Sequence, residues 1–96
     1  MNYSFFGTCS NDHNQLFGCL RTILNQTISP KEIILVNSGD ANIELEIGNM
    51  MNEEKIKLVY IHKKLTRVES LNLALDNSTA DYSFRFDTRT RFSKDY

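Results

Sequence analysis

Residues 32–36, Glu-Ile-Ile-Leu-Val, are the stretch of the chain that decides the fold. Four aliphatic residues follow one another there, whereas a strand with one face in water would alternate apolar and polar residues. Such a run is typical of a strand buried on both faces, as in a parallel sheet covered by helices. It ends in Asn37-Ser38-Gly39-Asp40, residue types that favour a turn. The stretch therefore predicts the centre of a parallel sheet.

The residues before this strand predict another strand and a helix. Residues 3–8 are short and aromatic-rich, which favours a strand. The polar residues 9–14 that follow can accept backbone N–H groups at a helix start. An amphipathic helix that ends near Asn25-Gln26, ahead of Pro30, is expected from apolar residues at three- and four-residue intervals: Leu16, Cys19, Leu20, Ile23 and Leu24.

The residues after the central strand continue the alternation. Strands are expected at residues 57–61 and 82–87. Helical spacing predicts a second helix on Ile43, Ile47, Met50 and Met51, which ends at Met51-Asn52, and a third on Val68, Leu71 and Leu75, with Asn72 beside them. The expected order is βαβαβαβ, an α/β, Rossmann-like parallel sheet flanked by helices in a single domain over residues 1–96.

Length, composition and charge narrow the class of protein. Ninety-six residues, 41% of them hydrophobic, suit one small globular domain. No apolar run approaches the roughly 20 residues of a membrane-spanning helix, and the N-terminus carries no signal-peptide pattern. We therefore expect a cytoplasmic protein, with the inner face of the membrane as a further location. The net charge of −1 indicates no nucleic-acid partner.

Charge is distributed unevenly along the chain. Residues 1–54 carry two basic and seven acidic side chains, whereas residues 55–96 carry nine basic and five acidic ones. The basic second half can face phosphate. A solvated surface of mixed charge explains the same composition equally well.

Several common site motifs are missing from the sequence. It contains no GxGxxG, no GxxxxGK[ST] and no GxSxG, so a dinucleotide fingerprint, a P-loop and a hydrolase nucleophile are not supported. Cys9 and Cys19 match no zinc spacing, and His13 and His62 are isolated. A flavodoxin-like or receiver module is an alternative for a chain with this order of elements, but the end of the first strand lacks the acidic cluster that a receiver needs.

The expected carboxyl ends of all four strands are polar. Ligands of such sheets bind beyond these ends, where the strand order reverses. Loops are polar in most proteins, which explains the polar composition of these four loops. It does not explain why every loop at this one end of the sheet carries groups suited to binding a ligand. The four loops begin Thr8-Cys9-Ser10-Asn11, Asn37-Ser38-Gly39-Asp40, His62-Lys63-Lys64 and Asp87-Thr88-Arg89.

Four segments together resemble the N-terminal half of family 2 glycosyltransferases, which have the GT-A fold. Residues 20–37 (LRTILNQTISPKEIILVN) are similar to the family stretch "cL.SilnQt..p.EiivvD", and residues 67–75 (RVESLNLAL) to its "GK..ALN.gl" helix. Residues 3–11 match the first strand and its loop, and residues 82–96 match the Asp-x-Asp strand. The last segment is similar to the exopolysaccharide branch of the family.

The resemblance implies a nucleotide-sugar site with a UDP-sugar as the donor. The implied nucleotide-binding residues are Thr8, Ser10, Asn11, Asn37, Ser38 and Arg67. Hydroxyl and amide groups suit this role because they both donate and accept hydrogen bonds. The family usually has Pro at position 8, an aromatic residue at position 10 and an acidic residue at position 37. An Arg67 guanidinium can bind phosphate oxygens, while a surface arginine at a helix start explains the residue equally well.

The resemblance also implies a divalent metal, Mg²⁺ or Mn²⁺, held by an Asp-x-Asp pair. Here the pair reads Asp87-Thr88-Arg89, and arginine has no lone pair for a metal. Two outcomes follow. Asp87 holds the cation with phosphates and water, or Arg89 and Arg91 neutralise the donor's diphosphate directly.

In the family, the catalytic base and the acceptor site lie in the C-terminal half. We therefore expect a truncated donor-binding half of a glycosyltransferase of polysaccharide or glycan biosynthesis, inactive alone. An unpaired edge at residues 82–87 would favour self-association. The alternative is a non-catalytic nucleotide-binding or assembly module that keeps the fold without the donor chemistry, which Asn37 and Arg89 favour.

Overall fold

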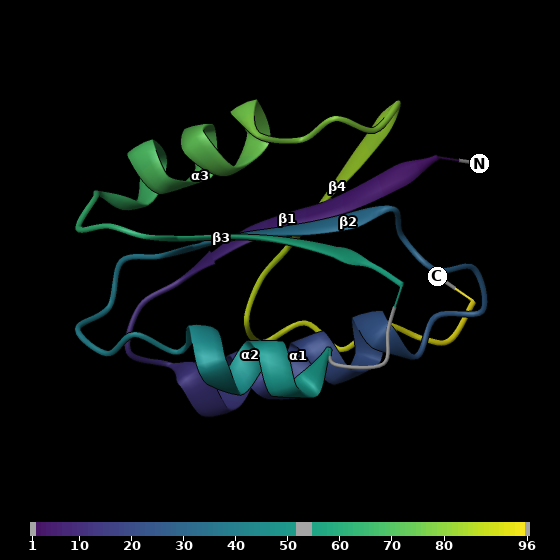
Figure 1. Ribbon diagram of the computed structural model, residues 1–96, viewed down its shortest axis with the longest axis horizontal. Helices are drawn as coiled ribbons and strands as arrows, with labels where there is room; N and C mark the ends of the chain where they lie inside the picture. The colour runs from purple at the N-terminus through teal and green to yellow at the C-terminus, as the bar shows by residue number, and fades with distance from the viewer. Residues whose placement is uncertain (1, 52–54, 96) are drawn as a thin grey trace.

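Four strands and three helices alternate along the chain in the computed structural model, which describes residues 2–51 and 55–95 (Figure 1). Their order is β1 (Tyr3–Cys9), α1 (His13–Leu24), β2 (Glu32–Asn37), α2 (Glu44–Met50), β3 (Lys57–His62), α3 (Arg67–Asp76) and β4 (Tyr82–Phe86). The expected βαβαβαβ order is confirmed. The expected end of the second helix at Met51-Asn52 is met at Met51, its C-cap, while position 52 lies outside the described residues. None of the described helices combines the length and the apolar character needed to cross a lipid bilayer.

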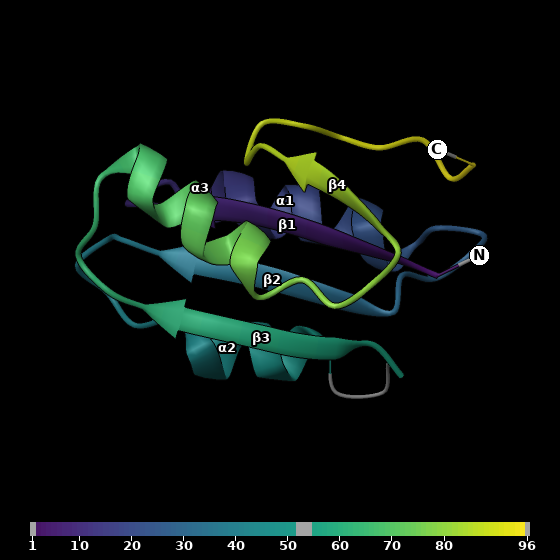
Figure 2. The same ribbon diagram turned by 90° about the horizontal axis from the view of Figure 1, so that it is seen from above.

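The four strands form one parallel sheet in the order β3-β2-β1-β4. In β1, Phe5 lies opposite Ile33 of β2 on one side and Phe84 of β4 on the other. All six residues of β2 are buried, as the aliphatic run predicts for a central strand. Helices α1 and α2 cover one face of the sheet and α3 covers the other (Figures 1 and 2).

The face under α1 and α2 holds the larger core. Its fully buried members include Phe5 of β1, Leu16 and Ile23 of α1, and Ile47 of α2. The face under α3 holds a smaller apolar cluster built on Ile34, Val36 and Ala74. Both clusters need β2, because its aliphatic side chains alternate between the two faces.

Small residues form the face of α3 that packs on the sheet. Val68 and Leu75 are 68% and 48% exposed, whereas Ser70 and Ala74 are fully buried. A capping box between Thr66 and the third helical residue fixes where the helix begins, and with it the face turned inward. Small residues four apart then let the helix approach the sheet closely. Val68 and Leu75, whose spacing predicted the helix, therefore lie on its exposed side.

The segment after β4 turns back toward α1 and is fixed there (Figure 2). The Phe92 ring lies 4.9 Å from that of Phe5, and the Phe92 amide donates to the Thr22 hydroxyl at 3.1 Å. The Gln26 side-chain amide donates to the Ser93 carbonyl at 2.6 Å. These contacts hold the chain that leads away from the carboxyl end of β4.

A fully buried carboxylate closes the amino end of the sheet. Glu32 accepts hydrogen bonds from the Ser4 hydroxyl at 3.1 Å and from the amide and hydroxyl of Thr79 at 2.6 and 2.9 Å. Burial opposes the charged form of Glu32, but these donors outweigh it and lower the pKa of the carboxyl. Glu32 therefore ties the loop before β4 to β1 and β2.

Candidate functional site

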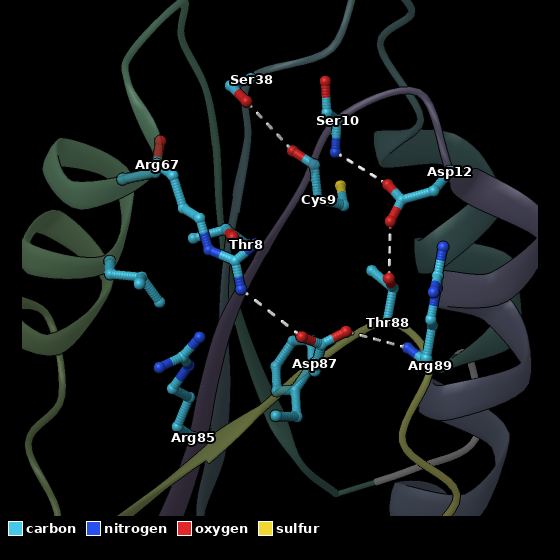
Figure 3. A pocket seen from close by; sticks show the side chains of 13 residues that line it. Thr8, Cys9, Ser10, Asp12, Ser38, Arg67, Arg85, Asp87, Thr88 and Arg89 are labelled. Carbon is cyan, nitrogen blue, oxygen red and sulfur yellow. Dashed lines mark hydrogen bonds and ion pairs between the residues drawn. The ribbon is translucent and has the colours of Figure 1, made fainter.

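A cavity of about 620 Å³ opens at the carboxyl ends of the strands (Figure 3). It lies between β1 and β4, where the chain changes direction across the sheet, the position at which open parallel sheets bind ligands. Its volume is typical of small-molecule sites. The lining residues are Thr8, Cys9, Ser10, Asp12, Ser38, Arg67, Ser70, Leu71, Arg85, Phe86, Asp87, Thr88 and Arg89.

Asp12 joins the loop after β1 to the loop after β4. Its Oδ1 atom accepts the Ser10 amide at 3.0 Å, and its Oδ2 atom accepts the Thr88 hydroxyl at 2.5 Å. Burial raises the pKa of Asp12, but the hydrogen bonds from Thr88 and Ser10 outweigh this effect and lower it overall. Asp12 is therefore a charged residue whose hydrogen bonds hold two walls of the cavity together. The sequence pattern indicates a helix cap at this position, yet its side chain makes no capping bond.

Two asparagines that the resemblance assigns to the nucleotide site make hydrogen bonds that hold loops together. The Asn37 amide donates to the Ala41 carbonyl and the Tyr60 hydroxyl, and its oxygen accepts the Gly39 amide at 2.8 Å. Asn11 accepts the Asp40 amide at 3.2 Å. Neither belongs to the described residues that line the cavity.

Gly39 allows the loops after β1 and β2 to meet. A Cβ atom at this position would lie 2.1 Å from the Ser10 carbonyl oxygen, so a side chain there would force the two backbones apart. Ser38, the preceding residue, donates its amide to the Cys9 carbonyl at 2.9 Å. The close approach places Ser10 and Ser38 on the same cavity wall.

Three arginines reach the cavity from three places in the chain. Arg67 is the first residue of α3, Arg85 belongs to β4, and Arg89 follows β4. Arg85 alternates with the buried Phe86, so it lies on the α3 side of the sheet, near Arg67 (Figure 3). With three arginines against two carboxylates, Asp12 and Asp87, the described lining is suited to an anion.

Asp87 lies among these arginines. Its Oδ2 atom is 3.5 Å from an Arg67 nitrogen, and its Oδ1 atom accepts the Arg89 backbone amide at 3.2 Å. The Arg67 and Asp87 side chains are 68% and 48% exposed, so solvent weakens their ion pair. Asp87 therefore keeps lone pairs that face the cavity.

Arg91 points away from the cavity toward α1. Its guanidinium donates to the carbonyls of Thr88 and Thr90 at 2.8 and 2.9 Å. It also packs over Gly18, where a Cβ atom would lie 2.5 Å from a guanidinium nitrogen. Among the described residues, Arg91 does not line the cavity, and its contacts shape the turn that carries Arg89.

The lining does not fit a divalent cation held by the protein. Within residues 2–51 and 55–95, no group of three or more His, Cys, Asp or Glu could hold a metal ion. Asp12 is already bound by Thr88 and Ser10, which leaves Asp87 as the one carboxylate free to coordinate, and hard cations require several oxygen ligands. Burial raises the pKa of the Cys9 thiol to about 12, so it offers no thiolate.

The family resemblance assigned Thr8, Ser10, Ser38, Arg67, Asp87 and Arg89 to the site, and all six line the cavity, but seven other lining residues were not assigned, among them Asp12, Ser70 and Arg85. The sequence indicates Asp12 only as one of several residues suited to a helix start, and Arg85 only as one residue of an alternating strand. Ser70 is fully buried, and no described residue bonds its hydroxyl. The signal for Arg85 was present, because it lies two residues before Asp87 and strands have a period of two.

Known proteins share both sequence and fold with this chain. The model of the family described as "Glycosyl transferase family 2" matches residues 8–95. Glycosyltransferase GlyA of Streptococcus pneumoniae serotype 4 (strain ATCC BAA-334 / TIGR4) is 29% identical over 87 residues, which are 90% of this chain and 12% of that protein.

Solved structures of S. aureus TarS have the same fold as this chain. The structure of TarS 1–349 in complex with UDP matches with a TM-score of 0.79 and 19% identity, over 99% of this chain and 29% of that chain. The complex of TarS 1–349 with UDP-GlcNAc matches with a TM-score of 0.74 and 18% identity, over 93% and 27%. The chain therefore spans less than a third of each of these relatives.

Proposed function

The chain belongs to glycosyl transferase family 2, and from this premise we propose that its cavity binds the nucleotide-sugar donor of a glycosyltransferase, with a UDP-sugar as the donor class. The observation that carries the proposal is the place of the cavity. It lies where the strand order reverses and combines hydroxyl groups with arginines. A nucleoside diphosphate presents the matching chemistry, a polar base and ribose beside a strong anion.

The nucleoside would bind at the ends of β1 and β2. Thr8, Ser10 and Ser38 line this wall, and their hydroxyls can both donate to and accept from a pyrimidine edge or a ribose. Asn11 and Asn37 position this wall by holding its loops. The structures of TarS bound to UDP and to UDP-GlcNAc, which share the fold, favour uridine as the nucleoside.

The diphosphate would bind at the end of β4, where Arg67, Arg85 and Arg89 line the cavity. Guanidinium groups bind phosphate oxygens through two parallel N–H donors. In this orientation the sugar would lie beyond Asp87. The chain thus supplies the donor-binding portion for transfer of the sugar to an acceptor in polysaccharide or glycan synthesis.

A non-catalytic nucleotide-binding module is the second candidate. Two observations favour it. Arg89 stands where the family has the second carboxylate, and both carboxylates of the described lining already contact protein donors. Both candidates predict nucleotide binding. Only the first predicts that protein containing this chain transfers a sugar or slowly hydrolyses the donor.

Calorimetry with uridine, UDP, UDP-GlcNAc, UDP-glucose and GDP tests the donor class. We expect UDP and the UDP-sugars to bind more tightly than GDP. Ser38→Ala should weaken UDP binding about fivefold, the effect of one lost hydrogen bond. Ser29→Ala, the same change at an exposed loop residue outside the cavity, is the matched control. A folded sample that binds none of these compounds would refute the proposal.

A further inference from the structure

The three arginines of the cavity offer a substitute for the metal that the lining does not fit. We propose that Arg67, Arg85 and Arg89 together bind the diphosphate of the donor directly, so that the donor binds without a divalent cation. The inference rests on the proposed nucleotide-sugar site. It concerns which groups of that site neutralise the phosphates.

The first support is that the arginines are available. Within residues 2–51 and 55–95, the guanidinium groups of Arg85 and Arg89 have no hydrogen-bond or ion-pair partner, although both residues line the cavity. Arg67 contacts only Asp87 there, in an ion pair at 3.5 Å that is mostly exposed. A weak exposed pair is readily exchanged for a phosphate. Arg91, by contrast, is committed to the Thr88 and Thr90 carbonyls.

The second support is the geometry of the three residues. They come from α3, from β4 and from the turn after β4, so they approach from different directions. Figure 3 shows Arg67 and Arg85 reaching into the space on one side of Asp87, with Arg89 on the other side. Groups that approach from several directions can bind both phosphoryl groups at once, as a metal ion would.

The third support is the role left to Asp87. In a metal site this carboxylate would be a ligand, yet here it accepts N–H donors from Arg67 and Arg89. It therefore contacts one guanidinium of the cluster, that of Arg67, and fixes the backbone at Arg89. Arginine suits this substitution better than lysine, because its planar fork matches the oxygens of a phosphate and is more weakly hydrated.

The test measures binding of UDP to the full chain by calorimetry, once with EDTA and once with Mn²⁺ or Mg²⁺. We expect dissociation constants in the two conditions that agree within about threefold. Arg67→Gln, Arg85→Gln and Arg89→Gln should each weaken UDP binding about 10- to 100-fold in EDTA, because each removes a charge-assisted contact. They should change uridine binding little.

Arg21→Gln is the matched control, since it removes one positive charge from the last turn of α1 and Arg21 does not line the cavity. It should leave UDP binding unchanged. Thermal unfolding of each variant checks that it is folded, and we expect little change because the arginines are exposed. UDP binding that requires Mn²⁺ would overturn this inference while leaving the proposed function intact. Absence of UDP binding in both conditions would overturn the proposed function itself.

Discussion

Polar groups at the two ends of the sheet differ in how completely they are buried and hydrogen-bonded. At the amino end, Glu32 is fully buried and its carboxylate receives hydrogen bonds from Ser4 and Thr79. At the carboxyl end, Asp87 is half-exposed, and the Ser70 hydroxyl has no partner among the described residues. Buried polar groups are costly unless they are paired. The comparison teaches that the amino end pairs its buried carboxylate for stability, whereas at the carboxyl end Asp12 and Asn37 are paired but Asp87 and Ser70 leave polar atoms open at the cavity.

The largest expected effect comes from removing the paired carboxylate. Glu32→Ala leaves the buried Ser4 hydroxyl and the Thr79 amide without their acceptor, so the free energy of unfolding should fall by about 3 kcal/mol. Urea unfolding measures the change. Glu46→Ala, at an exposed position of α2, is the control and should change stability by less than about 1 kcal/mol. If both variants lowered the free energy of unfolding equally, the buried carboxylate at the amino end would have no special role in stability.

A smaller effect is expected where the two loops of the cavity meet. Gly39→Ala places a Cβ atom 2.1 Å from the Ser10 carbonyl oxygen, so the loops must separate. We expect a loss of about 2 kcal/mol in stability and weaker UDP binding, because Ser10 and Ser38 move apart. Gly48→Ala is the matched control, since a Cβ there meets no described atom within 4 Å. It should stabilise α2 by about 0.5–1 kcal/mol. A neutral Gly39→Ala would show that the wall is not rigid.

The pH dependence of stability should reveal the charged state of the amino end. Because the folded pKa of Glu32 lies below its unfolded value, Glu32 stabilises the protein above the unfolded pKa. That contribution is lost as the pH falls through the folded pKa. The difference in unfolding free energy between the wild type and Glu32→Ala should therefore shrink by about 1 kcal/mol between pH 7 and pH 3. A constant difference would contradict the lowered pKa.

The smallest effect on stability is expected at the unpaired hydroxyl of α3. Ser70→Ala removes a buried group that bonds no described residue, so stability should stay the same or rise by less than about 1 kcal/mol. If the hydroxyl is kept for the ligand, UDP binding should weaken about threefold. Calorimetry and thermal unfolding on the same sample separate the two readouts. Lower stability with unchanged binding would make Ser70 a structural residue like Glu32.

Some of the cavity was predictable because strand ends are predictable. The aliphatic run at 32–36 located β2, and the alternation of helices and strands implied that the carboxyl ends share one edge. Thr8, Ser10 and Ser38 followed from their places after β1 and β2, and Asp87 and Arg89 from their place after β4.

Side-chain direction was not predictable to the same degree. Arg89 and Arg91 are two residues apart in one turn, yet only Arg89 lines the cavity, because contacts with Gly18 and nearby carbonyls hold Arg91 on α1. Asn37 has the residue type of a ligand group, but its side chain forms hydrogen bonds with Gly39 and Ala41 in the loop that follows it. These choices depend on neighbours that are distant in the sequence.

The sequence by itself determined the order of elements, the parallel sheet and the edge that carries the cavity, because hydrophobic periodicity and turn residues act locally. Only the tertiary structure decided which face α3 buries and that Asp12 joins two walls through Thr88. It also brought Arg67, Arg85 and Arg89 to the lining of one cavity. The physical reason is that burial and hydrogen-bond pairing depend on where each side chain meets the rest of the chain, which residue order alone does not specify.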